Sequence, residues 1–132
     1  MSNNNMDKKS VIFLRFSSFI LAVYAISFLI MPELLGDLVG FTHHSPNTLV
    51  EVTAFYGGLE LGLAIFLMWS AAERNRFYFA LMMLFFVFLS AGLARLFGII
   101  RFGFEDPSQP IVTALEIGWA IFSLWMARKY RS

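Results

Sequence analysis

Four long runs of apolar residues alternate with short polar stretches, at about residues 11–31, 50–72, 77–100 and 111–127. Each run comes close to the roughly 20 residues that an α-helix needs to cross a hydrocarbon core of about 30 Å. The first run stops at Pro32, and the second ends in the polar stretch Glu73-Arg74-Asn75-Arg76. The fourth run is slightly short for a full crossing. The connections are short, so the pattern predicts an all-α fold, a four-helix transmembrane bundle in up-down-up-down order.

Composition supports lipid as the solvent of this chain. Of 132 residues, 58% are hydrophobic, 16 are Phe and only 14% are charged, whereas soluble domains average about 25% charged residues. A soluble domain of this size has too little interior to bury so much apolar surface. With no Cys, disulfides and thiol catalysis are excluded. The net charge of +1 and the lack of a basic stripe argue against nucleic acid as a partner.

The first apolar run has an alternative interpretation as a secretory signal peptide, because Lys8-Lys9 precede it and Val23-Tyr24-Ala25 resembles a cleavage site. The run continues to Met31, which is longer than a signal-peptide core usually is. We therefore favour a membrane-spanning helix.

Basic residues predict the orientation of the chain in the membrane, because cytoplasmic loops carry an excess of Lys and Arg. With four crossings, seven basic residues lie on one side, while the opposite loops, about 32–49 and 101–110, contain only Arg101. We therefore predict that both termini are cytoplasmic and that the protein lies in the inner (plasma) membrane. The seven residues are Lys8, Lys9, Arg74, Arg76, Arg128, Lys129 and Arg131.

The remaining segments predict a simple organisation. The Asn-rich residues 1–9 predict a disordered cytoplasmic tail, and residues 10–132 a single transmembrane domain. The amphipathic stretch from Leu34 to Phe41 predicts a short helix or lid on the membrane surface. Its glycines, Gly36 and Gly40, leave a plain loop as the alternative.

Three charged residues, Glu60, Arg95 and Glu116, lie well inside apolar runs. A charge at such depth costs roughly 2.5–3.5 kcal/mol on insertion scales and usually marks a pair, a pathway or a binding site. Counting along the predicted helices places all three in the central or outer half of the bundle. They are the candidate functional residues.

Neighbouring polar residues extend this candidate site. Helical spacing predicts that Thr53, Tyr56 and Glu60 share one face of the second helix, and that Thr113 and Glu116 share one face of the fourth. Glu51 lies at the periphery of the same region. These residues predict a buried polar cluster or a ligand-binding site, with no catalytic residue assigned and no cofactor or metal.

Two interpretations of the charged residues remain open. In one, Arg95 bridges Glu60 or Glu116 as a structural ion pair that aligns the helices. In the other, two carboxylates face one guanidinium, so one carboxyl group holds a proton and binds a ligand, relays protons or acts as an acid.

Small residues and histidines offer two weaker motifs. Ala54, Gly58 and Gly62 form a small-residue stripe of the GxxxG type on the second helix, which predicts packing against a neighbouring helix, or alternatively a homodimer. His43-His44 could contribute metal ligands only with Asp37 or Glu51. Adjacent histidines without a spaced partner are instead typical of an exposed loop.

The chain also resembles a family of small bacterial membrane proteins known as a domain of unknown function (family 4345). The resemblance rests on Tyr56-Gly57-Gly58-Leu59-Glu60-Leu61-Gly62, on Ala91-Gly92-Leu93-Ala94-Arg95 with Gly98, and on Glu116. It covers about residues 10–127 and implies a four-helix membrane protein without implying an activity. A looser, topological likeness connects the chain to the DoxX-type proteins, some of which are accessory subunits of redox systems.

Three functions are compatible with the sequence. The first is a non-catalytic accessory subunit, or a binder of a lipid or small apolar ligand, in a homodimer or larger membrane complex. The second is an isomerase-like intramembrane enzyme that uses Glu60 or Glu116 as acid and base. The third is a small transporter or proton relay, although the chain lacks the inverted repeats that are common in transporters.

Overall fold

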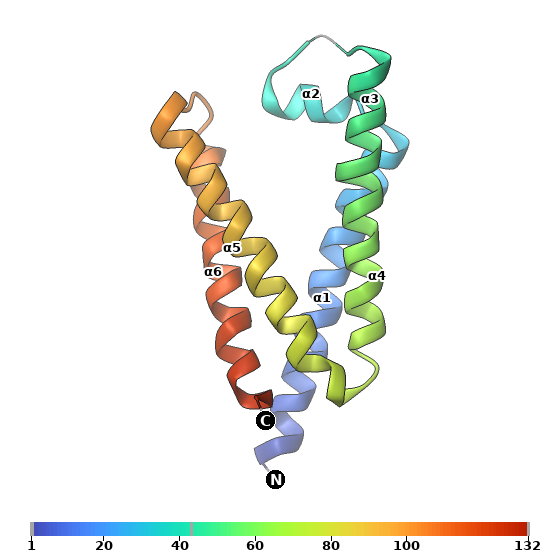
Figure 1. The fold of residues 1–132 in the computed structure, drawn as a ribbon, viewed down its shortest axis with the longest axis vertical. Coiled ribbons are helices and arrows are strands. Elements are labelled where there is room, and N and C mark those ends of the chain that lie inside the picture. The colour runs from blue at the N-terminus through green and yellow to red at the C-terminus, as the bar shows by residue number, and fades with distance from the viewer. Residues whose placement is uncertain (1, 43, 132) are drawn as a thin grey trace. The chain divides into compact units, whose positions relative to one another are not determined.

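The protein is helical along most of its length, and no strand occurs among residues 2–42 and 44–131, which the computed structural model describes. The chain divides into two units, Met1–Arg74 and Asn75–Ser132. Figure 1 shows each unit as a set of long helices joined by short connections. In chain order the elements are α1 (Ser2–Ile30), α2 (Leu34–Val39), α3 (Pro46–Val52), the π-helix η1 (Thr53–Leu59), α4 (Glu60–Ser70), the 3₁₀-helix η2 (Arg74–Arg76), α5 (Phe77–Phe102), α6 (Ser108–Ala127) and the 3₁₀-helix η3 (Arg128–Tyr130).

Four continuous helical stretches are long and apolar enough to cross a membrane: Asn4–Ile30, Pro46–Ser70, Arg74–Phe102 and Ser108–Tyr130. A helix is the structure that apolar runs adopt in lipid, because it satisfies every backbone N–H and C=O within the segment. The prediction of four membrane-spanning helices is therefore confirmed, and the protein is a multi-pass membrane protein.

The first helix begins earlier than the sequence indicated. The predicted disordered tail was residues 1–9, but α1 starts at Ser2, so the prediction was wrong for residues 2–9. An ion pair links this part of α1 to the last residue of the first unit, because Nε of Arg74 donates to Oδ2 of Asp7 at 2.8 Å. Each further residue adds a hydrogen bond to an existing helix at small cost, which favours this extension.

The second and fourth spans also begin earlier than predicted, because residues that are suited to a helix start precede the apolar runs. Ser45 caps α3 by accepting a hydrogen bond from the backbone N–H of Thr48, with Pro46 in the first helical turn. In α6, Pro110 lies in the first turn, where its missing N–H removes no helical hydrogen bond. The last span reaches 23 residues with η3, so the prediction that it is short was wrong.

The stretch after the first span forms the predicted short helix, α2. It ends at Gly40, whose φ of +89° strongly favours glycine and whose N–H bonds to the carbonyl of Gly36. Leu35 packs into an apolar core with Phe28 of α1 and Val52 of α3. This core holds α2 to the ends of α1 and α3.

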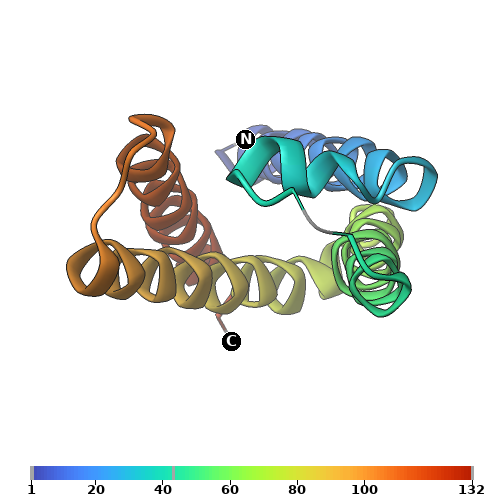
Figure 2. The ribbon, with the colours of Figure 1, turned by 90° about the horizontal axis from the view of Figure 1, so that it is seen from above.

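Each unit is built on one antiparallel helix pair. In the first unit α1 lies along η1 and α4, and in the second α5 lies along α6 (Figures 1 and 2). The close packing of α1 and α4 includes a hydrogen bond of 2.7 Å from the Ser18 hydroxyl to the carbonyl of Ala64. Sequential helices are therefore antiparallel neighbours within each unit, as the short connections predicted.

Candidate functional site

Glu60 is the first residue of α4 and directly follows the π-helix η1. A π-helix closes its turns with i→i+5 hydrogen bonds and occurs frequently at functional sites. The predicted i, i+3 and i, i+4 spacing from Thr53 to Glu60 assumed a continuous α-helix, and this assumption was wrong. The wider turns of η1 therefore affect the direction in which the Glu60 side chain points from the helix.

Two contacts define the register of α1 against η1 and α4. A Cβ added to Gly57 would lie 2.7 Å from Cδ2 of Leu29, so a larger residue would force the Leu29 side chain to move. Seven residues further along the helix, Ala64 accepts the hydrogen bond from Ser18. In an antiparallel pair the residue midway between these contacts faces the middle of the partner segment. By this interpolation Glu60 lies level with residues 22–25 of α1, of which Ala25 is buried and Tyr24 is exposed.

In this location one oxygen of the Glu60 carboxyl group lacks a hydrogen-bond donor. Its Oε2 atom is buried and has no hydrogen-bond partner among the described residues. No described side chain of α1 donates a hydrogen bond to this oxygen. An unsatisfied buried polar atom usually costs about 1–3 kcal/mol, so the first unit retains an energetically unfavourable group within its membrane span.

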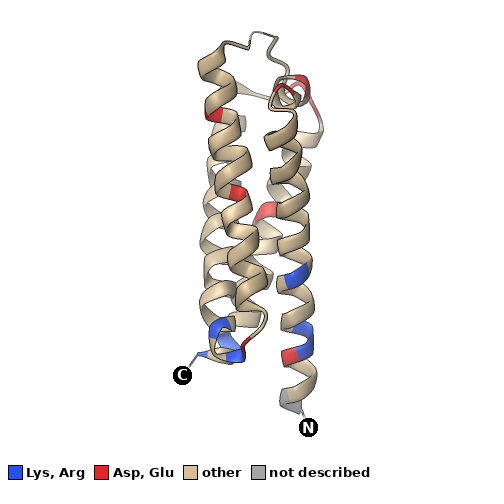
Figure 3. Cartoon of the chain, turned by 90° about the vertical axis from the view of Figure 1, so that its right-hand side faces the viewer, with Lys and Arg blue, Asp and Glu red and all other residues tan. Residues whose placement is uncertain are grey.

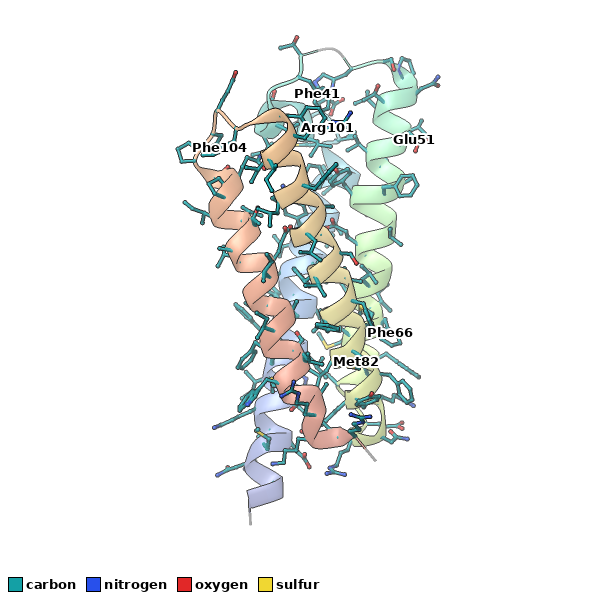
Figure 4. The ribbon with its side chains drawn as sticks, turned by 60° about the vertical axis from the view of Figure 1, so that its left-hand side comes forward. Phe41, Glu51, Phe66, Met82, Arg101 and Phe104 are labelled. Carbon is teal, nitrogen blue, oxygen red and sulfur yellow. The ribbon has the colours of Figure 1, made fainter. Side chains whose placement is uncertain are left out.

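The other residues predicted around Glu60 have different environments. The Thr53 hydroxyl donates to the carbonyl of Leu49, one turn earlier in its own helix, at 2.8 Å. Tyr56 packs edge-on against Phe28 of α1, with ring centroids 5.6 Å apart, and remains 41% exposed. Glu51 is exposed near the start of the span, well away from Phe66 further along α4 (Figure 4). Tyr56 is thus the predicted neighbour that shares the α1-facing side with Glu60.

The predicted stripe of small residues on the second span does not pack closely against α1 in the first unit. Ala54, Gly58 and Gly62 are exposed, and no atom of α1 lies within 4 Å of a Cβ added to either glycine. The close approach to α1 is made by Gly57 instead. A role for the stripe in helix packing or dimerisation stays a prediction.

In the second unit, Arg95 of α5 and Glu116 of α6 form a bidentate ion pair. Nε of Arg95 donates to Oε2 of Glu116 at 3.0 Å, and Nη2 donates to Oε1 at 2.8 Å. Two parallel N–H···O bonds are the strong, geometrically specific form of this interaction. Glu116 is only 13% exposed in its side chain. The arginine therefore neutralises this intramembrane carboxylate.

Gln109 completes this cluster and was not predicted from the sequence. Its Oε1 accepts a hydrogen bond of 3.2 Å from Nη1 of Arg95, and its backbone carbonyl accepts from the buried Thr113 hydroxyl at 2.9 Å. Gln109, Thr113 and Glu116 have the i, i+4, i+7 spacing of one helix face. That signal was present in the sequence, but it lay outside the helix predicted to begin at residue 111.

A glycine brings α6 close to α5 at the level of the ion pair. A Cβ added to Gly92, one turn before Arg95, would lie 2.8 Å from Cγ1 of Ile117 and 3.3 Å from Cβ of Glu116. Gly98 has no such neighbour. Of the two glycines, Gly92 is the one that allows Glu116 to reach Arg95.

The histidine motif has only one member in the described part of the chain. His43 lies outside the described residues, and the His44 ring packs against Phe41, with ring centroids 5.3 Å apart. The ring also occupies the space that a Cβ on Gly36 would need. No three His, Cys, Asp or Glu side chains among the described residues lie close enough to hold a metal ion.

The sequence profile of one protein family, described as "Domain of unknown function (DUF4345)", matches residues 10–127. This match covers most of the chain, so the protein belongs to that family, as its motifs indicated. No curated protein and no solved structure matches the chain significantly. The likeness to DoxX-type proteins stays a prediction.

Proposed function

We propose that this family member is a non-catalytic membrane component that binds a lipid or another small apolar molecule through Glu60. The observation that carries the proposal is the buried Oε2 atom of Glu60, which has no hydrogen-bond partner among the described residues. A ligand that donates a hydrogen bond to this oxygen would remove the cost of leaving it unsatisfied.

The contrast with Glu116 supports a binding role for Glu60. Both carboxyl groups lie inside membrane spans, but Glu116 has its charge matched by Arg95. A protein that used both glutamates structurally would gain by pairing each of them. Glu60 is thus the carboxyl group that stays available to a ligand.

The same contrast favours binding over acid–base catalysis. An isomerase needs groups that give and take protons at one substrate. Glu116 is engaged by two donor groups of Arg95, and no described residue hydrogen-bonds Oε2 of Glu60. A single carboxyl group with an unsatisfied buried oxygen is suited to holding a ligand.

We also infer that the protein lies in a bacterial inner membrane with both termini in the cytoplasm. The support is the bias of Lys and Arg toward one side of the four spans. Figure 3 shows the basic residues of α1 confined to the half of that helix nearest the N-terminus. In this orientation α2 and α3 face outward, and the ligand of Glu60 comes from the bilayer as an accessory lipid or as cargo for a partner subunit.

Ligand retention during purification tests the proposal. The wild type, Glu60→Leu and Glu105→Gln are extracted in mild detergent, and native mass spectrometry with solvent extraction identifies bound molecules. Glu105 is an exposed loop residue, so Glu105→Gln is a matched control that removes one carboxylate elsewhere in the chain. We expect the wild type and Glu105→Gln to retain a lipid or small apolar molecule, and Glu60→Leu to lose it at least tenfold. A ligand-free wild type, or equal retention by the folded Glu60→Leu variant, would refute the proposal.

A further inference from the structure

Positive charge is absent from most of the first unit. Between Arg15 and Arg74 the sequence contains no Lys or Arg, although it contains five acidic residues. Glu60 is the one of these that lies within the apolar part of a span. The other four are Glu33, Asp37, Glu51 and Glu73.

The second unit shows how this chain accommodates a carboxylate in the membrane. Glu116 forms a bidentate pair with a guanidinium group, and the side-chain oxygen Oε1 of Gln109 accepts a further N–H of the same arginine. The charge of the glutamate is therefore balanced by a cation supplied by the chain. Within the first unit, no described residue forms an ion pair with Glu60.

We propose that the missing cation is supplied by the ligand, so that Glu60 binds the head of a lipophilic amine. This inference rests on the proposed function and specifies its ligand class. An ammonium group donates hydrogen bonds and brings one positive charge, and charge-assisted hydrogen bonds are roughly twice as strong as neutral ones. The hydrocarbon part of the amine remains in the apolar span. A neutral alcohol supplies the hydrogen bond without the charge, and a fatty acid or phosphate would be repelled.

Aromatic residues beside Glu60 are also suited to a cation. Tyr56 lies about one turn before Glu60, and its ring packs edge-on against Phe28, which in turn packs against Tyr24 at 4.8 Å between centroids. The faces of aromatic rings attract ammonium groups within about 6 Å, most strongly where water is excluded. Tyr56 remains 41% exposed, so its ring can contact a ligand at Glu60.

Exposed acids gather at one end of the first unit and favour cations there. Glu33 precedes α2, Asp37 lies within it and Glu51 lies in α3, and all three are exposed. Figure 3 shows acidic residues and no basic ones at this end of the unit. Negative potential raises the local concentration of cationic ligands and weakens as salt is added.

Two probes with the same hydrocarbon chain separate charge from hydrophobicity. Dodecylamine and dodecanol are titrated calorimetrically into protein in phosphatidylcholine nanodiscs, and the heats for empty nanodiscs are subtracted. The wild type is compared with Glu60→Gln, which keeps hydrogen-bonding capacity but removes the charge, with Glu60→Leu, and with the control Glu105→Gln. We expect dodecylamine to bind the wild type and Glu105→Gln at least tenfold more tightly than it binds Glu60→Gln. We also expect dodecanol to bind the wild type at least tenfold more weakly than dodecylamine does.

The failures of the two proposals are distinguishable. Equal binding of both probes to the wild type, lost only in Glu60→Leu, would overturn the amine inference and leave the binding role of Glu60 intact. Dodecylamine binding that is the same in the wild type, Glu60→Gln and Glu60→Leu would overturn the inference by placing the amine elsewhere. Absence of binding by either probe, together with a ligand-free purified wild type, would overturn both proposals.

Discussion

At the scale of single residues, the two intramembrane glutamates show how one side chain acquires different roles. Glu116 lies opposite an arginine, and Gly92 allows α5 and α6 to approach closely enough for a bidentate pair. The Oε2 atom of Glu60 is buried and has no hydrogen-bond partner among the described residues. The residues across the helix interface decide whether each carboxyl group has a hydrogen-bond partner.

Removing one member of the ion pair should destabilise the second unit. Glu116→Ala leaves Arg95 without its counter-charge, and loss of one partner of a buried pair typically costs about 3–5 kcal/mol. We expect the lower end of this range, because the Arg95 side chain is 35% exposed. Thermal unfolding in detergent, followed by circular dichroism, measures the effect. The double variant Arg95→Ala/Glu116→Ala should lose less than the sum of the single variants, and strict additivity would show that the pair contributes no coupling.

Removing the unpaired carboxyl group should have the opposite effect. Glu60→Leu replaces a buried atom that has no hydrogen-bond partner with an apolar side chain, so we expect stability to rise by about 1–3 kcal/mol. The same unfolding assay applies, on protein stripped of bound ligand. A clear loss of stability in Glu60→Leu would mean that the carboxyl group has a structural partner.

Asp106, in the loop between α5 and α6, should make the start of α6 sensitive to acid. The backbone N–H and then the hydroxyl of Ser108 donate to its carboxylate, and both lower the pKa of Asp106 below the ordinary value. Because the folded pKa is depressed, the stabilisation is complete above the unfolded pKa of about 3.9 and is lost as pH falls through the folded value.

A comparison with the neighbouring exposed carboxylate tests this expectation. Asp106→Ala should lower the Tm slightly at pH 6, and the difference from wild type should shrink as the pH approaches 3. Glu105→Ala, which removes a carboxylate without these hydrogen bonds, should have little effect at either pH. A difference for Asp106→Ala that persists unchanged at pH 3 would contradict the ionic origin of the effect.

At the scale of elements, the second span is a composite of α3, the π-helix η1 and α4. The π-helix separates the capped start of the span, at Ser45, from the Glu60 region. It also brings Tyr56 and Gly57 onto α1, against Phe28 and Leu29. The positions of the residues proposed to contact a ligand therefore depend on how η1 packs, and not on the sequence spacing alone.

Matched glycine substitutions test this packing. Gly57→Ala places a methyl group 2.7 Å from Cδ2 and 2.8 Å from Cγ of Leu29, and overpacking of this kind costs typically 1–3 kcal/mol. Gly62→Ala meets open space on the same span, so we expect stability to be unchanged or to rise by up to about 1 kcal/mol from helix propensity. The Tm values of the two variants in detergent measure this difference in stability. A Gly57→Ala variant as stable as Gly62→Ala would show that α1 and η1 are not in close contact.

At the scale of the whole molecule, four spans and two helix pairs follow from simple properties of the chain. Each span exceeds the length needed to cross the hydrocarbon core, and basic residues gather in the segments on one side. In α2, Leu38 and Val39 are each 53% exposed. Such a helix is suited to the membrane surface.

The predicted orientation can be tested cleanly because the chain contains no Cys. Single cysteines replace two exposed asparagines, Asn47 at the start of α3 and Asn75 between α4 and α5. A membrane-impermeant maleimide applied to spheroplasts should label Asn47→Cys immediately and Asn75→Cys only after lysis. The reverse pattern would invert the topology, and labelling of both before lysis would contradict the four-span arrangement.

Several features were predictable from sequence because each depends on local composition. Apolar runs long enough for a bilayer determine the number of spans, and the distribution of Lys and Arg predicts their direction. The helix cap at Ser45-Pro46 could also be recognised in the sequence, although the apolar pattern alone placed the helix start at residue 50. Glu60, Arg95 and Glu116 stood out because charges inside an apolar run are costly.

Contacts between helices could not be predicted in the same way. The choice of Glu116 as a partner of Arg95, the contribution of Gln109, and the close approach at Gly57 each depend on the rotation and register of one helix against another. The π-helix changes that rotation by altering the backbone hydrogen bonds between Thr53 and Leu59. The sequence alone therefore determined that this protein crosses a membrane four times with charged groups inside. Tertiary structure alone decided which carboxyl group is neutralised, because a buried charge is satisfied only by the atoms that packing brings within hydrogen-bond distance.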